Sequence, residues 1–426
     1  MNMQSIRSGA AFVLGLILFA GSSFAAAPAD DLGNLGHHLT PVVVFPAFHF
    51  TVLEATVRHQ TVAPGCPSSG TFLDFFPNLT PDPTFSQVCK DKLMTLVVDP
   101  NTHKPMAKRF SDQRGVTVRI KNYGKTESAP AYEVMYQTLE AHGYQRNKNI
   151  RVAGNDSRLT PDIGDITLRA KLLIEQTYFE NGLTPVHLVA HSNGPFYVQY
   201  LLTHTSPAWK KIFIHGFTSI AGNYPGQGLF YPVFFTGFNV NNFSFPDNAA
   251  NAASSAAMYL SHPSSYMSSA DPAVFGNQEV VVAVPGTQYT PADAQALFAD
   301  ANLPLAAQLA AYYIGFVKFT QPSDFPNVDV YAEKGSGLDT IVGLALPDLT
   351  VGQVVPDLNN PANFFSRDGD SNQEDLTNDA IQVWSAMPCY RFSLTSNGGV
   401  GHFALPDDPA LLQRLVDHLG LARSNC

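Results

Sequence analysis

One segment constrains the fold of this chain more than any other, because residues 185–200 have the pattern of a buried strand that turns sharply into a helix. The apolar run Val186 to Ala190 leads into the turn Ser192-Asn193-Gly194. Such a turn pushes the serine Oγ away from the backbone, and small flanking residues let the helix approach the strand. With Ala190 and Gly194 as flanks, the pattern indicates a nucleophilic Ser192. The alternative interpretation is an ordinary helix start with Ser192 as its N-cap.

Strand-like runs and helical patterns alternate along most of the chain, which predicts an α/β fold with a mostly parallel sheet and helices on both faces. The expected strands cover Pro41 to Phe45, Val116 to Ile120, Asn149 to Ala153, Val186 to Ala190, Ile212 to Ile220, Val328 to Ala332 and Tyr390 to Leu394. The expected helices cover Tyr132 to His142, Ile166 to Glu180, and a last helix that begins at Asp408-Pro409 and stops at Gly420.

Two stretches interrupt this alternation within a main domain expected to cover residues 36–426. Residues 60–95 are rich in Pro, Ser, Phe and Thr and contain two cysteines, so we expect a small disulfide-bounded subdomain. Residues 223–325 are apolar but irregular, with a helix near Pro291 to Asp300. An insertion of this kind after a central strand favours a cap over an active site. The alternative is a second domain without a role in chemistry.

The N-terminus and the overall charge bear on location and partners. An apolar run from Ala10 to Phe19 follows Arg7 and ends in small residues, which predicts a signal peptide over residues 1–25. We therefore expect a secreted protein or one in a lysosomal or vacuolar lumen. The chain has 25 basic and 35 acidic residues and no basic block, so nucleic acid is not an expected partner.

The cysteines and glycosylation sequons agree with a secretory route. Four cysteines permit three connectivities, of which we favour Cys66 with Cys89 and Cys389 with Cys426. Asn-x-Ser/Thr sequons begin at Asn78, Asn155 and Asn242.

A serine hydroxyl is a poor nucleophile until a histidine takes its proton, and a carboxylate must orient that histidine. In α/β-hydrolases these partners follow the serine in the order acid, then histidine. Three histidines lie far enough downstream: His262, His402 and His418. His262 falls in the cap-like insertion, and His418 on the polar side of the last helix, where we expect a solvated residue. His402 lies in a glycine-rich loop after the last strand and is the predicted base.

The acid is less constrained by the residues alone. Asp368-Gly369-Asp370 follows an aromatic pair, whereas Asp339 follows the expected strand Val328 to Ala332. Each of these aspartates could lie at a strand's carboxyl end, and each could equally be an N-cap or turn residue.

Several segments, in order along nearly the whole chain after the leader, resemble the lecithin:cholesterol acyltransferase and lysosomal phospholipase A2 family. They are Pro41 to Pro46 with Leu53-Glu54-Ala55, the loop Cys66 to Cys89, Pro185 to Gly194, Pro207 to Lys210, Asp368-Gly369-Asp370 and Gly401-His402. The resemblance implies an α/β-hydrolase fold in which the second aspartate, Asp370, is the acid of the triad.

The resemblance also implies a function. Members of that family cleave a glycerophospholipid ester through a serine acyl-enzyme and pass the acyl chain to water or to a lipid alcohol. Their cap and small disulfide-bounded subdomain contact membranes and acyl chains, which would correspond to residues 223–325 and 60–95. We therefore expect a phospholipid or other acyl-lipid substrate and peripheral contact with a lipid surface. No metal or organic cofactor is implied.

The chain departs from the family at three places. Pro46 to Phe50 replaces the family's Pro-Gly-Asp-Leu-Gly at the oxyanion loop, Ser371 to Asp375 replaces Gly-Thr-Val, and Asn155 to Arg158 replaces Tyr-Asp-Trp-Arg. Because backbone N–H groups stabilise an oxyanion, the predicted donors are the amides of Phe48 and Asn193. The chain is thus interpreted as a distant member. Alternative functions are a neutral-lipid lipase, a general carboxylesterase, or a non-catalytic lipid-binding relative.

Overall fold

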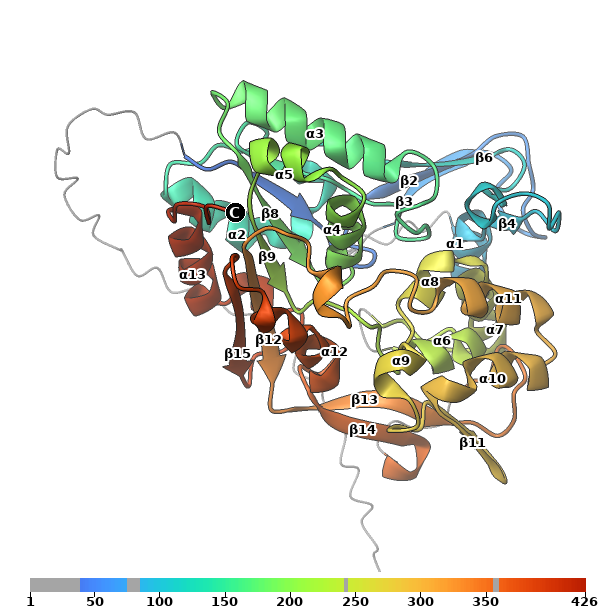
Figure 1. Ribbon diagram of the computed structural model, residues 1–426. Helices are drawn as coiled ribbons and strands as arrows, with labels where there is room; N and C mark the ends of the chain where they lie inside the picture. The colour runs from blue at the N-terminus through green and yellow to red at the C-terminus, as the bar shows by residue number, and fades with distance from the viewer. Residues whose placement is uncertain (1–38, 75–84, 241–243, 355–359) are drawn as a thin grey trace, which may run out of the picture. The chain divides into compact units, whose positions relative to one another are not determined.

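A computed structural model describes residues 39–74, 85–240, 244–354 and 360–426 (Figure 1). The predicted signal peptide and the sequons at Asn78 and Asn242 lie outside these residues. No helix within the described ranges is long and apolar enough to cross a membrane.

Six parallel strands form the central sheet of the described chain, in the order β15-β12-β9-β8-β1-β7. Their bounds are β1 Val42–Phe45, β7 Ile150–Val152, β8 Val186–His191, β9 Ile214–Ile220, β12 Val330–Ser336 and β15 Phe392–Gly398. Every residue of β1 and β8 is buried. A parallel sheet needs such continuous apolar runs because helices cover both of its faces.

Alternate residues of β1 pack against helices on opposite faces of the sheet. Val42 and Val44 share a core with α2 (Glu133–Ala141) and α13 (Pro409–Leu419). Val43 and Phe45 point the other way, into a core with α3, α4 and α5. These helices span Ile166–Glu180, Gly194–Thr203 and Pro207–Phe213. The predicted α/β fold with helices on both faces is therefore confirmed (Figure 1).

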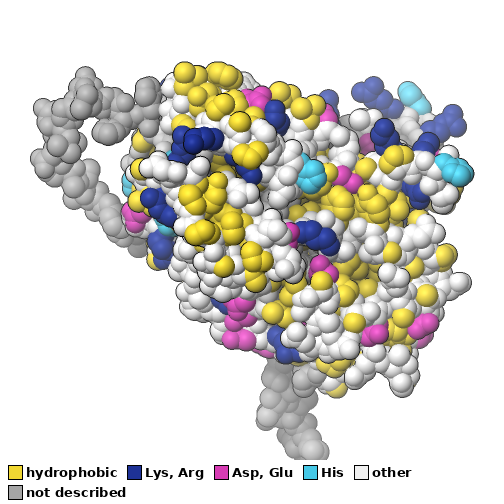
Figure 2. All heavy atoms as spheres, viewed as in Figure 1, with side chains coloured by type: hydrophobic (Ala, Val, Ile, Leu, Met, Phe, Trp, Pro, Cys, Tyr) yellow, Lys and Arg dark blue, Asp and Glu magenta, His cyan; other side chains and the backbone are white. Residues whose placement is uncertain are grey.

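The long helix α3 buries only one of its faces. Ala170 and Leu173 point inward, as the periodicity predicts, whereas Leu168, Leu172 and Phe179 are exposed. Figure 2 shows hydrophobic side chains at the surface over this helix. Scattered apolar residues on an outer face are usual in globular proteins.

A second, antiparallel sheet contains β2 (Leu53–Val57), β3 (Gly70–Asp74) and β6 (Val116–Ile120) in the order β3-β2-β6. The expected strand at 116–120 therefore exists, but outside the parallel sheet. Its alternating burial is the physical reason, because a strand of an antiparallel sheet can leave one face to solvent. The same region contains β4 Val97–Val98, β5 Phe110–Ser111 and helix α1 (Gln87–Met94), which the Cys66–Cys89 disulfide ties to the preceding loop.

The described residues of 223–240 and 244–325 form a helical layer with a small sheet. Its helices are α6 Phe230–Thr236, α7 Ala249–Ser261, α8 Pro263–Met267, α9 Pro272–Phe275, α10 Ala294–Asp300 and α11 Pro304–Tyr313. Its strands β10 (Val282–Val284) and β11 (Thr287–Tyr289) are joined by two later strands, β13 (Leu338–Ala345) and β14 (Phe364–Gly369). After β14 comes the short helix α12 (Asp375–Asp379).

This helical layer and the disulfide-bounded segment share one hydrophobic core. Cys66, Cys89 and Leu93 from the segment belong to the same cluster as Phe234 and Leu309 from the layer. The two insertions therefore stabilise each other rather than forming separate cores.

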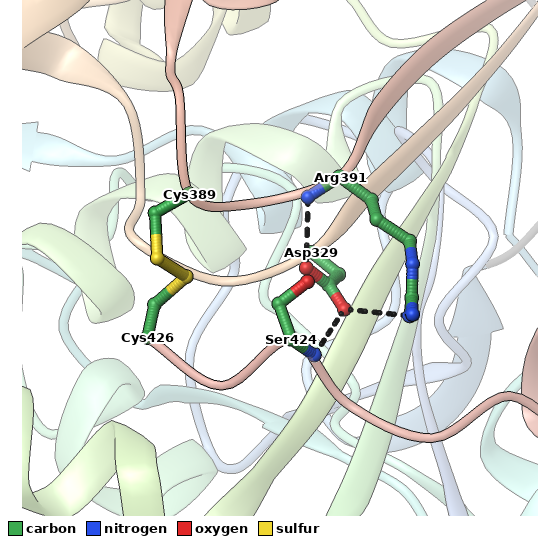
Figure 3. Close-up of a disulfide and its surroundings, with 5 residues drawn as sticks. All are labelled: Asp329, Cys389, Arg391, Ser424 and Cys426. Carbon is green, nitrogen blue, oxygen red and sulfur yellow. Dashed lines mark hydrogen bonds and ion pairs between the residues drawn. A yellow bond between two sulfur atoms is a disulfide. The ribbon is translucent and has the colours of Figure 1, made fainter.

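The C-terminal segment is fastened at the amino-terminal ends of β12 and β15 (Figure 3). The Cys389–Cys426 disulfide lies beside Asp329, whose Oδ1 accepts the backbone N–H of Arg391 at 2.9 Å. Oδ2 of Asp329 accepts the backbone N–H of Ser424 at 3.0 Å and the Arg391 guanidinium at 3.3 Å. A covalent bond and a buried carboxylate together hold the terminal segment.

Replacing Cys389 and Cys426 together by serine should lower the free energy of unfolding by about 2–4 kcal/mol, because the bridge restricts the unfolded chain. Urea denaturation of the unreduced protein measures this. Ser424→Ala is the matched control, since Asp329 binds the backbone of Ser424 and not its side chain. An unchanged urea midpoint for the double variant would contradict the prediction.

Candidate active site

The turn between β8 and α4 holds Ser192 in a left-handed conformation, with φ of 57°. The serine's backbone N–H donates to the Ile220 carbonyl at 2.9 Å, and its carbonyl accepts the Asn223 N–H at 2.8 Å. Gly194 is required in this turn, since a Cβ there would lie 2.3 Å from the Phe45 carbonyl oxygen. The sequence pattern thus produces the strained strand-to-helix turn that presents a serine hydroxyl.

Two later loops bring a histidine and an aspartate to this serine. Nε2 of His402 lies 3.0 Å from the Ser192 Oγ, and Nδ1 of His402 lies 2.8 Å from Oδ2 of Asp370. The backbone of the same two residues is joined as well, because the His402 N–H donates to the Asp370 carbonyl at 2.8 Å. Both side chains are 1% exposed.

The carboxylate of Asp370 is oriented by its own loop. Its second oxygen, Oδ1, accepts the backbone N–H groups of Asn372 at 3.0 Å and Gln373 at 2.7 Å. One oxygen is thus held by the turn and the other faces His402. Close packing against β12 also fixes the position of Asp370, since a Cβ on Gly335 would lie 2.7 Å from the Asp370 Cβ.

The other sequence candidates lie elsewhere. Asp339 and Asp368 face each other across the β13–β14 pair and are exposed. His262 is buried in the helical layer, where its Nε2 contacts the Met94 carbonyl at 3.0 Å. His418 is not a solvated surface residue as expected, because its ring stacks on Tyr331 with centroids 3.8 Å apart.

The loop Pro46 to Phe50, which departs from the resembled family, is pinned from two sides. Nδ2 of Asn155 donates to the Pro46 carbonyl at 3.1 Å, and the Asn155 N–H donates to Thr51 Oγ1 at 3.1 Å. On the other side, the Ala47 N–H donates to the Tyr132 hydroxyl at 2.9 Å. Within the described residues, the backbone N–H groups of Phe48 and Asn193 bond to no other protein group. They remain available to a ligand.

Asn155 begins a sequon, but it is 2% exposed and its side-chain amide nitrogen donates to the Pro46 carbonyl. In the folded protein this residue braces the loop and does not present an acceptor for a glycan. The spacing of a sequon carries no information on burial, so only the structure separates the two roles.

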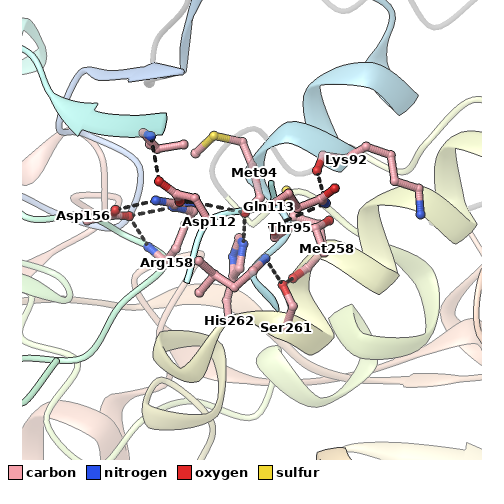
Figure 4. A network of polar contacts seen from close by, with 12 residues as sticks. Lys92, Met94, Thr95, Asp112, Gln113, Asp156, Arg158, Met258, Ser261 and His262 are labelled. Atoms are coloured by element: carbon pink, nitrogen blue, oxygen red, sulfur yellow. Dashed lines mark hydrogen bonds and ion pairs between the residues drawn. The ribbon is translucent and has the colours of Figure 1, made fainter. Parts of the chain in front are cut away.

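Arg158, at the end of the departing Asn155 to Arg158 segment, bonds to both insertions. Its guanidinium donates to Met94 (Figure 4), and its own carbonyl accepts the Ser264 N–H at 3.5 Å. Its guanidinium pairs with Asp156 at 2.7 Å and with Asp112 at 2.9 Å. It also donates to the Met94 carbonyl at 3.4 Å, which is shared with His262. Burial alone lowers the pKa of Arg158, but the two carboxylates outweigh burial and hold that pKa above its ordinary value.

Two buried carboxyl groups lie where the helical layer meets the Asp370 loop. No sequence pattern indicated them. Glu279 and Glu374 are 5% and 2% exposed. Oε1 of Glu374 accepts the Gly228 N–H at 3.1 Å, whereas Oε1 of Glu279 and Oε2 of Glu374 have no donor among the described residues. Burial raises the pKa of both carboxyls, and the charge of Glu374 further raises the pKa of Glu279. Because burial favours the neutral form of each carboxyl, we expect at least one of the two to hold its proton in the folded chain.

From this carboxyl pair we expect the free energy of unfolding to fall as pH rises. Both carboxyls hold their protons more tightly in the folded chain than in the unfolded chain, because burial raises the pKa of Glu374 to about 7 and that of Glu279 to about 9. The stabilisation is therefore complete below the ordinary Glu pKa of about 4.3 and is lost progressively as pH rises through these folded values. We expect the Tm to decline by several degrees between pH 5 and pH 9. Glu279→Gln should flatten this decline, since the amide can donate to Glu374 without a titrating proton.

Differential scanning calorimetry across that pH range measures the effect. Glu180→Gln, at an exposed ion pair with Arg151, is the matched control and should leave the slope unchanged. Equal slopes in wild type and Glu279→Gln would refute the assignment of the decline to this pair.

A parallel sheet with a serine on a strand-to-helix turn, followed in the chain by an aspartate and a histidine at hydrogen-bonding distance, defines an α/β-hydrolase fold. In a crystal structure titled as the Tle4–Tli4 complex, a chain with 11% identity superposes with a TM-score of 0.51, covering 90% of this chain and 99% of that one. At this identity the match supports the fold alone.

The sequence model of the lecithin:cholesterol acyltransferase family matches residues 83–335, more than half of the chain, and the protein belongs to that family. Mouse lysosomal phospholipase A and acyltransferase is 26% identical over 316 residues, which cover 70% of this chain and 71% of the mouse protein. Mouse phosphatidylcholine-sterol acyltransferase is 28% identical over 248 residues, which cover 54% of this chain and 53% of that protein. The resemblance seen in the sequence motifs is confirmed.

Proposed function

We propose that the protein is a serine phospholipase A or O-acyltransferase that cleaves an acyl ester of a glycerophospholipid. The observation that carries this proposal is the continuous contact from Ser192 through His402 to Asp370, buried at the end of the sheet. That arrangement supports acyl transfer through a serine. The names of the relatives, a phospholipase and acyltransferase and a phosphatidylcholine-sterol acyltransferase, support the phospholipid ester as the substrate.

Each group has a defined role in the proposed reaction. The Ser192 Oγ attacks the ester carbonyl while Nε2 of His402 accepts its proton, and Asp370 stabilises the resulting imidazolium through Nδ1. The amides of Phe48 and Asn193 stabilise the tetrahedral oxyanion. His402 then protonates the leaving glycerol oxygen. The oxygen of water or of a lipid alcohol then attacks the acyl-enzyme carbonyl while His402 takes its proton. His402 returns that proton to the Ser192 Oγ as the bond between the acyl group and Ser192 breaks.

The shared core of the two insertions supports lipid as the substrate class. The described residues of 60–95 and 223–325 form an apolar body that reaches the oxyanion loop, where Phe48 packs against Phe230 with ring centroids 5.5 Å apart. In this proposal the insertions receive the acyl chain and contact a lipid surface. A secreted or luminal location, which the leader suggests, would bring the enzyme to such surfaces.

The first test is a lipid-product assay. The purified protein is incubated with vesicles of phosphatidylcholine and triacylglycerol, and products are measured by mass spectrometry. We expect lysophospholipid and free fatty acid, and an acylated alcohol when a lipid alcohol is present. Products from triacylglycerol only would support a neutral-lipid lipase instead.

The roles of Asp370 and Ser192 are tested by substitution. Asp370→Asn should lower kcat by about 10³ to 10⁴-fold, because it loses the acceptor that fixes the His402 tautomer. Asp339→Asn, at an exposed aspartate outside the site, is the matched control. A fluorophosphonate should label wild-type protein and not Ser192→Ala. A folded wild-type protein that resists labelling would be the expected result for a non-catalytic lipid-binding protein.

A further inference from the structure

His191, the residue before the proposed nucleophile, is buried and has contacts at both ring nitrogens. Nδ1 lies 3.2 Å from the Tyr132 hydroxyl, and Nε2 lies 3.2 Å from the carbonyl oxygen of His402. Its ring is also packed 5.0 Å from the His402 ring, between centroids. None of the roles assigned above uses these contacts.

The hydrogens in this chain of contacts can point in only one direction. The Ala47 N–H can only donate, so the Tyr132 oxygen accepts it at 2.9 Å and the tyrosine's own hydrogen is directed to His191 Nδ1. The His402 carbonyl can only accept, so His191 must carry its proton on Nε2. A neutral ring with the proton on Nε2 is the single form that satisfies all four groups.

The surroundings favour this neutral form. Burial lowers the pKa of His191 well below its ordinary value, and the neighbouring His402 lowers it further. An uncharged His191 also places no like charge beside His402 when that ring takes up the serine proton.

We propose that Tyr132 and His191 are positioning residues, which hold the oxyanion loop and the histidine loop in register with the serine turn. This series of hydrogen bonds begins at the backbone N–H of Ala47, next to Phe48. It passes through His191 at the end of β8 and ends on the backbone carbonyl of His402. These segments come from different parts of the sequence, and a shift of any one of them would lengthen one of these hydrogen bonds. This inference rests on the proposed function, because positioning matters only if Ser192 and His402 react.

Tyr132→Phe tests the proposal, since it removes one hydroxyl and keeps the ring. We expect kcat for the soluble ester 4-nitrophenyl butyrate to fall at least about tenfold with KM within about twofold, because reacting groups are misplaced while binding is retained. Tyr136→Phe is the matched control. Its hydroxyl is equally buried in the same core, but it donates to the Ala129 carbonyl at 3.0 Å and makes none of the bonds between Ala47, Tyr132, His191 and His402.

Two variants of His191 separate positioning from folding. Gln can accept from Tyr132 and donate to the His402 carbonyl, so His191→Gln should retain more of the wild-type kcat than His191→Leu. Thermal unfolding of every variant shows whether it is folded. Equal losses of kcat in Tyr132→Phe and Tyr136→Phe, or no advantage of Gln over Leu, would overturn the inference.

The same assay distinguishes this failure from failure of the proposed function. If the esterase activity of the wild type disappears in Ser192→Ala, the proposed function stands, and the variants of Tyr132, Tyr136 and His191 decide the inference. A wild type without Ser192-dependent activity would overturn the proposed function and the inference with it.

Discussion

The left-handed turn at Ser192 is the constraint on which the rest of the site depends. A residue other than glycine adopts this conformation at a cost, and here the sheet imposes it through backbone bonds to Ile220 and Asn223. The turn is possible only because α4 approaches β1 at Gly194, so close that a methyl group would overlap the Phe45 carbonyl. The serine's position is therefore a property of the packed sheet, and the loops of His402 and Asp370 are arranged around it.

Around this turn the protein uses buried polar contacts as cross-links between distant segments. Asn155 and Tyr132 pin the oxyanion loop, Arg158 bonds to both insertions, and Glu374, which follows the Asp370 turn, accepts a bond from the helical layer. Each of these groups would be unfavourable if buried alone. Because each is paired, a shift in one segment breaks a bond, which gives the site a defined geometry despite its departures from the family pattern.

Several features were predictable from residues alone because local patterns determine them. The helices at 166–180 and 409–419 follow from apolar periodicity and a capping Asp408, and the strands at 42–45 and 186–191 from continuous apolar runs. Other features were not predictable. The strand at 116–120 has an ordinary strand pattern whichever sheet it joins, and the stacking of His418 on Tyr331 depends on a strand distant in sequence.

The sequence by itself determined the order of strands and helices, the serine turn and the candidates for its partners, since these depend on residues near one another in the chain. It left three aspartates open, and only the resemblance favoured Asp370. The tertiary structure decided which carboxylate lies at the histidine, that Asn155 is a brace, and that Tyr132 and His191 contact both loops. The physical reason is that burial and hydrogen-bond partners arise from contacts between segments up to about 200 residues apart, which no local pattern records.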